Sequence, residues 1–151
     1  MSPEGMVHAL EEAHRLLTPG GVLVDIHPFV EPSHLEVHRR GRRSFSQPWE
    51  DCPPEGYHQA DRALSWAVRS GLFIRERRAS FEYLVYADSV SGLQAYLAEQ
   101  SGFQGEGGDE AEAARQVALF ARLADAHALA GEGAEVASRD RAHITRLVVV
   151  K

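Results

Sequence analysis

The chain has 151 residues, 44% of them hydrophobic and 25% charged, which is enough for one globular domain with a core of its own. Its net charge of −6 argues against a dedicated nucleic-acid binder, and no apolar run approaches the ~18 residues that span a membrane. Because the sequence does not open on a basic-then-apolar signal segment, we expect a cytoplasmic protein that forms a single domain over 1–151.

The beginning of the chain predicts a helix, a tight turn and a strand. Residues 18–21, Thr-Pro-Gly-Gly, favour a type II turn, which takes proline at its second position and glycine at its third. The strand at 22–27 is apolar apart from Asp25 and its polar end, so we expect both of its faces to be covered, as in a parallel strand between helices. The helix before the turn is indicated by an apolar stripe at Met6, Leu10, Ala13 and Leu17.

Residues 29–55 are rich in proline and predict irregular structure around one small element. The stretch 34–46 favours a β-hairpin with an Arg-Gly step at its centre. A short helix is the alternative, because Ser33 and Glu36 have the spacing of a capping box. Cys52, the single cysteine of the chain, has no partner for an internal disulfide, and we interpret it as an incidental loop thiol.

The rest of the chain predicts a helix at 56–70, a long strand at 72–86, two helices within 89–131 and a final strand at 135–150. Gly71 is placed to end the first of these helices. The second helix within 89–131 is the stronger one, and its expected core stripe consists of Ala113, Val117, Phe120, Ala124 and Ala128.

Residues 9–28 read ALEEAHRLLTPGGVLVDIHP, and this stretch resembles the late helix–turn–strand unit of class I S-adenosylmethionine-dependent methyltransferases. The later elements also follow the order of the C-terminal half of that fold. The resemblance implies an α/β fragment of α+β character, with helices on a mixed sheet in the strand order 22–27, 135–150, 72–86. The last strand would lie antiparallel between the other two. The helical insertion at 89–131 and the segment 29–55 depart from the plain family pattern.

The resemblance also implies that a cofactor-binding half is lacking. The family binds S-adenosylmethionine with a glycine-rich turn after its first strand and an acidic residue at the end of its second. Neither can be placed in this sequence, and the glycine-rich stretch 105–108 follows a helix, so we interpret it as a connector. We therefore expect a methyltransferase-like protein that takes up no cofactor by itself and is not active alone.

A strand left without its usual neighbour recruits a partner. The first hypothesis is a non-catalytic remnant that forms a homodimer through the edge strand 22–27. The second is the substrate-side subunit of a split methyltransferase, completed by a separate cofactor-binding half. The third is a small-ligand-binding α+β protein that is unrelated to methyl transfer.

His27 is the candidate substrate-binding residue, because it lies where the strand ends, the position that lines the ligand crevice in open α/β sheets. The alternative is a polar strand end that faces solvent. Asp25 could be a buried acid, although the sequence shows no partner for it. We predict no catalytic, cofactor-binding or metal-ligating residue.

Three further sets of residues could have either a functional or a purely structural role. His34 and His38 would share a metal ion on a helix, but on a strand they would lie about 13 Å apart. The arginine run at 39–43 could bind phosphate, yet a solvated hairpin tip balanced by Glu36 is favoured. Five aromatic residues could line a pocket or belong to the core, and these are Trp49, Trp66, Phe81, Tyr83 and Tyr86.

Overall fold

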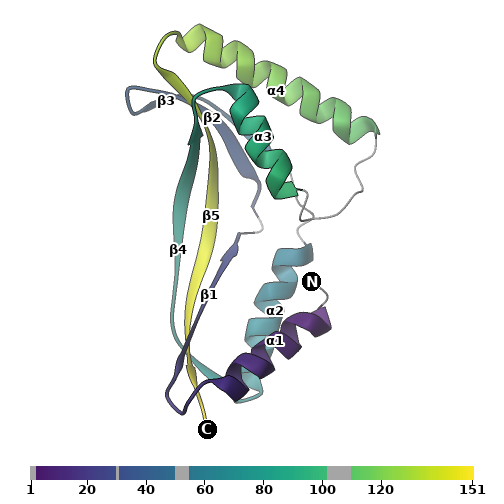
Figure 1. The fold of residues 1–151 in the computed structure, drawn as a ribbon, viewed down its shortest axis with the longest axis vertical. Helices are drawn as coiled ribbons and strands as arrows, with labels where there is room; N and C mark the ends of the chain where they lie inside the picture. Colours follow the sequence, from purple (N-terminus) through teal and green to yellow (C-terminus); the bar gives the residue numbers. More distant parts are fainter. Residues whose placement is uncertain (1–2, 30, 50–54, 102–109) are drawn as a thin grey trace. The chain divides into compact units, whose positions relative to one another are not determined.

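The computed structural model describes residues 3–29, 31–49, 55–101 and 110–151 (Figure 1). These residues form four helices and a five-stranded open sheet, which confirms the predicted α+β character. The sheet is antiparallel and not mixed as predicted. No helix in the described ranges is both long and apolar enough to cross a bilayer. The elements in chain order are α1 (Pro3–Leu16), β1 (Val22–Pro28), β2 (Ser33–Arg39), β3 (Arg42–Trp49), α2 (Glu55–Arg69), β4 (Phe73–Ala87), α3 (Val90–Ser101), α4 (Glu110–Ala130) and β5 (Ala134–Val149).

The strand β5 organises the sheet. β1 pairs antiparallel with its second half, from Val22 opposite Val148 to Pro28 opposite Ala142. β2 pairs antiparallel with its first half, from His34 opposite Arg139 onward, and β4 pairs with β5 as well. Figure 1 shows β5 between β1 and β4. This arrangement confirms the predicted strand order 22–27, 135–150, 72–86.

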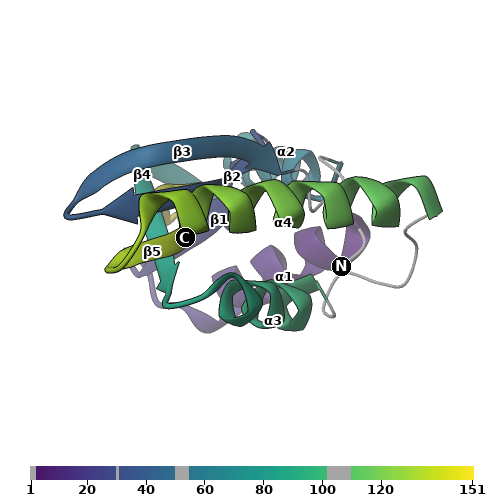
Figure 2. The same cartoon turned by 90° about the horizontal axis from the view of Figure 1, so that it is seen from above.

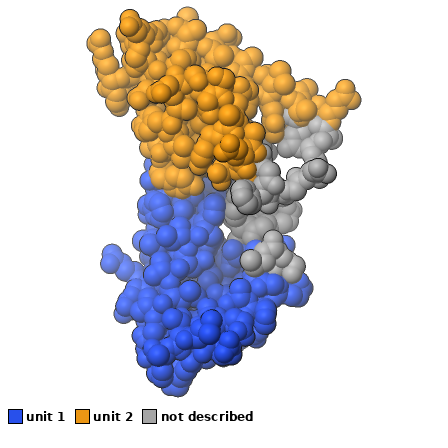
Figure 3. Space-filling view, in the orientation of Figure 1, with its two compact units in different colours: residues 1–31, 53–82, 141–151 blue, residues 32–52, 83–140 orange. Residues whose placement is uncertain are grey.

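The chain divides into two compact units that alternate along the sequence (Figure 3). Unit 1 consists of residues 1–31, 53–82 and 141–151, and unit 2 consists of residues 32–52 and 83–140. Each unit has its own cluster of buried hydrophobic side chains. The single domain predicted over 1–151 stays a prediction.

Unit 1 begins with the predicted turn between α1 and β1. The amide of Gly21 donates a hydrogen bond of 2.8 Å to the carbonyl oxygen of Thr18, and Gly20 has a φ of 74°. Both features match the third and fourth positions of a type II turn, in which glycine accepts a positive φ without strain. The turn leads α1 back beside α2, and Leu10 of α1 packs against a buried cluster formed by Leu64, Ala67, Phe73, Leu147 and Val149.

The expectation that both faces of the strand 22–27 are covered is wrong. Leu23 packs against the unit 1 cluster, whereas Val22, Val24 and Ile26 are 38%, 51% and 59% exposed. The reason is that β1 is bonded antiparallel to β5 rather than flanked by parallel strands, and in the described residues helices cover one face of it.

Unit 2 contains the predicted hairpin, which is longer than expected and spans β2 and β3. Arg39 faces Arg42 across a two-residue turn whose central residues, Arg40 and Gly41, have φ values of 51° and 72°. Positive φ at both positions is the signature of a type I′ turn, whose twist suits a hairpin. The alternative of a short helix starting near Ser33 is wrong, because the Arg-Gly step closes a hairpin there.

α4 packs on β2 and β3 in unit 2, as Figure 2 shows. Its buried side chains are Leu119 and Leu123, with Phe120 partly buried beside them. The predicted stripe is therefore wrong except at Phe120, and Val117 is 71% exposed. Alanine occurs on every side of this helix, so its spacing could not select the face that packs.

The opposite face of β2 carries a buried charge. Glu36 is 1% exposed and accepts hydrogen bonds from Arg139 (2.8 Å), Arg43 (3.0 Å), Ser46 (3.1 Å) and His38 (2.8 Å). Burial alone would raise the pKa of this carboxyl group, but the four donors outweigh it and lower the pKa from 4.5 to about 2. The network thus ties β2 to β3 and β5 through one ionised side chain.

Replacing Glu36 with Gln should destabilise the protein, because Arg139 and Arg43 lose the charge that compensates them. We expect a loss of about 2–4 kcal/mol in the free energy of unfolding, measured by urea denaturation at neutral pH. The control is Glu135→Gln, which removes an exposed carboxylate of β5. A Glu36→Gln protein as stable as this control would contradict the assignment.

The same network predicts that the stability of the protein depends on pH in the acidic range. Because the folded pKa of Glu36 lies below its ordinary value of 4.5, its contribution to stability is present above pH 4.5 and is lost as the pH falls toward 2. The difference in stability between Glu36→Gln and the unaltered protein should shrink over that interval. A difference that stays constant with pH would contradict the prediction.

Candidate functional site

A polar cluster in unit 1 surrounds His27. The side chains of Leu23, Asp25 and His27 share one face of β1, because successive residues of a strand alternate between faces. Leu23 meets the apolar cluster, and the polar pair follows it toward the end of the strand. His27 is 7% exposed, and its Nδ1 lies 2.6 Å from Oδ2 of Asp25, to which it donates a hydrogen bond. His27 therefore does not face solvent, and its role in substrate binding stays a prediction.

α2 and β4 complete the charge pattern around the imidazole. Asp61 of α2 places Oδ1 at 3.4 Å from Nε2 of His27, within ion-pair distance. Arg78 of β4 donates to the same carboxylate oxygen at 2.7 Å. His27 is thus flanked by two carboxylates, one of which is shared with an arginine.

His143 of β5 lies opposite His27 in the strand register, with 5.5 Å between the ring centroids. Phe29 packs on its other side at 3.8 Å between centroids, and the guanidinium of Arg141 lies 4.5 Å from the Phe29 ring. Arg141 also pairs with Glu31 at 2.7 Å. The result is a row of four groups in contact: a cation, a benzene ring and two imidazoles.

The pKa values of the two histidines are shifted in opposite directions. The hydrogen bond to Asp25 raises the pKa of His27, and the charge of Asp61 adds to this effect against the opposing cost of burial. Burial lowers the pKa of His143, and the nearby charges of Arg78 and His27 lower it further. At a pH between the pKa values of the two rings, His27 carries a positive charge and His143 is neutral.

Such a pair can hold a proton at a fixed place and offer a neutral imidazole beside it. His27 is shielded, so it acts as a positioned positive charge, while the half-buried His143 is the more accessible ring. Within the described ranges, no group of three or more His, Cys, Asp or Glu side chains is arranged to hold a metal ion.

His34, His38 and the arginine run at 39–43 belong to unit 2, whereas the cluster around His27 belongs to unit 1. His34 and His38 are both on β2 and bind different partners, Ser46 at 3.2 Å and Glu36 at 2.8 Å. In the arginine run, Arg43 pairs with Glu36, and its neighbours Arg39, Arg40 and Arg42 are exposed at the hairpin tip. Cys52 and the glycine-rich stretch 105–108 lie outside the described residues.

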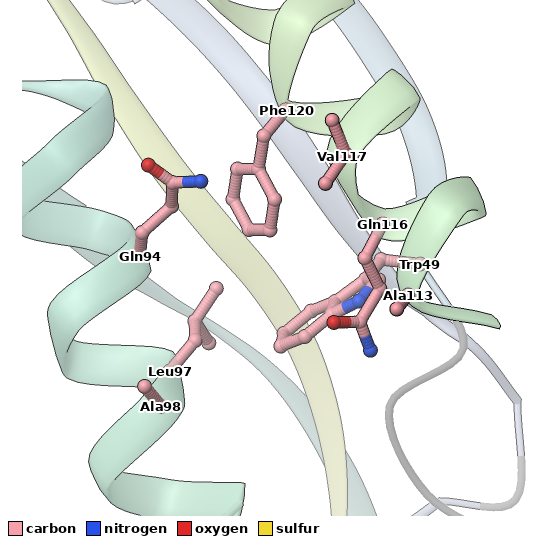
Figure 4. A pocket seen from close by; sticks show the side chains of 8 residues that line it. All are labelled: Trp49, Gln94, Leu97, Ala98, Ala113, Gln116, Val117 and Phe120. Carbon is pink, nitrogen blue, oxygen red and sulfur yellow. The ribbon is translucent and has the colours of Figure 1, made fainter. Parts of the chain in front are cut away.

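A second candidate site is a cavity of about 360 Å³ in unit 2 (Figure 4). Trp49 at the end of β3 lines it, together with residues of α3 and α4. Trp66, Phe81, Tyr83 and Tyr86 do not line it, so the five aromatic residues do not form one pocket. Besides Trp49, the lining includes Gln94, Leu97, Gln116, Val117 and Phe120.

Comparison with known proteins gives no relative. No family model, no curated protein and no solved structure matches the chain. Function therefore has to be argued from the geometry of the molecule itself.

Sequence reasoning missed Asp61, Arg78 and His143. They reach His27 from α2, β4 and β5, which are far from it along the chain. The one local signal was Asp25-Ile26-His27, since a carboxylate and an imidazole two residues apart on a strand share a face and can bond.

Replacing Asp25 with Asn should lower the pKa of His27, because the hydrogen-bonded carboxylate is the main cause of its elevation. NMR titration of the histidine ring protons measures this. In the unaltered protein His27 should titrate above 6.5 and His143 below 6.5. The control is Asp88→Asn, which alters an exposed aspartate in unit 2 and should leave the pKa values of His27 and His143 unchanged.

Stability should follow the same titration. A raised pKa in the folded state means that His27 stabilises the protein fully below pH 6.5 and that this contribution disappears as the pH rises through its folded value. Asp25→Asn should reduce that alkaline loss. Titration of His27 at or below 6.5 in the unaltered protein would contradict the site as described.

Proposed function

We propose that this chain is a methyltransferase-like module that self-associates through β1 and does not transfer methyl groups by itself. The observation that carries the proposal is the outer edge of β1, which is free of strand partners in the part of the chain that the structure describes. The helix–turn–strand unit at 9–28 and the position of β5 beside both β1 and β4 support the methyltransferase-like character. A cytoplasmic location is part of the proposal and rests on composition.

The register shows which backbone groups of β1 face outward. The amide of Phe29 donates to the carbonyl oxygen of Arg141 at 2.9 Å, and the amide of Val149 donates to that of Gly21 at 2.9 Å. In an antiparallel pair, every second residue exchanges both of its hydrogen bonds with the partner strand. Odd-numbered residues of β1 therefore bond to β5, and the even-numbered residues Val22, Val24 and Ile26 direct their backbone groups outward.

The chemistry of this edge suits a strand partner. Edge strands that stay single are usually protected by charged side chains, prolines or bulges. The outward positions of β1 instead carry exposed Val22, Val24 and Ile26, while the ionisable residues of the strand, Asp25 and His27, point to the covered face. Pro28, which has no amide hydrogen, occupies the next outward position, where it removes no bond to β5.

A second copy of the chain is the partner that we propose. Two identical edges can pair antiparallel about a two-fold axis, which satisfies the same groups on both and closes the assembly. Val24 and Ile26 of each copy would then approach their counterparts and bury apolar surface that is otherwise exposed.

The second candidate function is the substrate-side subunit of a split methyltransferase. The cluster around His27 favours it, because a buried imidazole held by Asp25 and Asp61 lies at the carboxyl end of β1. In open α/β sheets this end borders the ligand crevice. In that case β1 would take up a strand from a separate cofactor-binding half.

Light scattering should report a dimer for the unaltered chain. The double variant Val24→Lys/Ile26→Lys should be a monomer at the same concentration, because like charges would meet across the paired edges. The control is Ile74→Lys, which places a lysine at a 60% exposed position of β4. A monomeric unaltered chain, or dissociation caused only by the control, would contradict the proposal.

Titration calorimetry with S-adenosylmethionine should show no binding to the chain alone, because none of its residues matches the cofactor motif of the family. Stoichiometric binding would show that the chain holds the methyl donor unaided and would overturn the non-catalytic assignment. Binding that appears only after a cofactor-binding partner is added would favour the split enzyme.

A further inference from the structure

The cavity of unit 2 lies between two helices and the end of a strand. α3 supplies Gln94 and Leu97, and α4 supplies Gln116, Val117 and Phe120. Figure 4 shows Trp49 below Phe120 and Val117 and across the space from Leu97. Its volume of about 360 Å³ falls at the lower end of the range for small-molecule sites.

Trp49, which lines this cavity, has a buried hydrogen-bonding group without a partner. The residue is 6% exposed, and its Nε1 has no hydrogen-bond partner among the residues that the structure describes. A buried N–H without an acceptor destabilises the protein, so such groups usually meet a partner. Figure 4 shows this nitrogen on the side of Gln116, an exposed side chain whose rotation would open a path to it.

The lining residues that the structure describes are all uncharged. It combines two aromatic rings with aliphatic side chains and two amides, Gln94 and Gln116. The rings of Trp49 and Phe120 meet edge to face at 6.2 Å between centroids, and both line the cavity, where a flat ligand could pack against them. Amides offer both a donor and an acceptor, so they select polar but neutral groups.

We propose that this cavity is a binding site for a neutral, planar aromatic compound that carries a carbonyl oxygen or an equivalent acceptor. The ring system packs between Trp49, Leu97 and Phe120, and the acceptor receives the hydrogen bond of the Trp49 indole. Ionised ligands are disfavoured, because no charged side chain of the described lining would compensate their desolvation. This site is independent of the edge of β1 and of methyl transfer.

The probe is Prodan, a neutral naphthyl ketone whose emission moves to the blue in an apolar site. Titration of Prodan with the protein should give a saturable blue shift of the Prodan emission, with one site per chain. The same dimethylaminonaphthalene without the ketone should bind about tenfold more weakly, because it offers no acceptor to Trp49.

Two helix variants test the location. Ala113→Leu fills the cavity from α4 and should weaken Prodan binding about tenfold or more. Ala114→Leu is the matched control, since it makes the same change at the next residue, which is exposed and does not line the cavity. Leucine suits a helix at either position, so both proteins should fold.

Trp49→Phe tests the hydrogen bond. This variant keeps an aromatic ring and removes the donor, so the ketone should lose its tenfold advantage over the ketone-free probe. Because that ratio compares two probes on the same protein, a general loss of stability does not affect it. The proposal is overturned by the absence of a blue shift, by equal binding in the two alanine variants, or by a ketone advantage that persists in Trp49→Phe.

Discussion

The fold depends on the hydrogen bonding of β5. β1, β2 and β4 all pair with this strand, and β3 joins the sheet through β2. Its residues also enter both hydrophobic clusters, with Val136 in unit 2 and Leu147 in unit 1. Since β1 and β2 precede β5 by most of the described chain, their sheet pairing closes long loops, and such non-local pairing slows folding. Neither cluster is complete until the segment 134–149 is in place.

Two buried polar groups are stabilised in different ways. Glu36 is held ionised by donors from three strands, and a charge so fully compensated has a structural role. Carboxylates raise the pKa of His27, whereas burial and nearby positive charge lower the pKa of its neighbour His143. Oppositely shifted neighbours are typical of sites that manage protons. The contrast explains why we place the candidate site at His27 rather than at Glu36.

Local patterns in the sequence predicted the elements well and the contacts poorly. The Pro-Gly-Gly turn and the Arg-Gly step have backbone requirements that glycine satisfies, so both turns could be predicted from a few residues. The burial of only one face of β1 could not be predicted, because a short apolar run does not show how many of its faces are buried. The partners of His27 were missed for a different reason: Asp61 and His143 come near it only through tertiary packing.

Pro28 limits what the edge of β1 can accept. An incoming strand can bond to residues 22–27, a length of about 20 Å, and then meets a position that has no amide hydrogen. Growth of the sheet by successive additions of longer strands is therefore blocked at one end. Pro28 therefore sets the length over which a strand could pair with this edge.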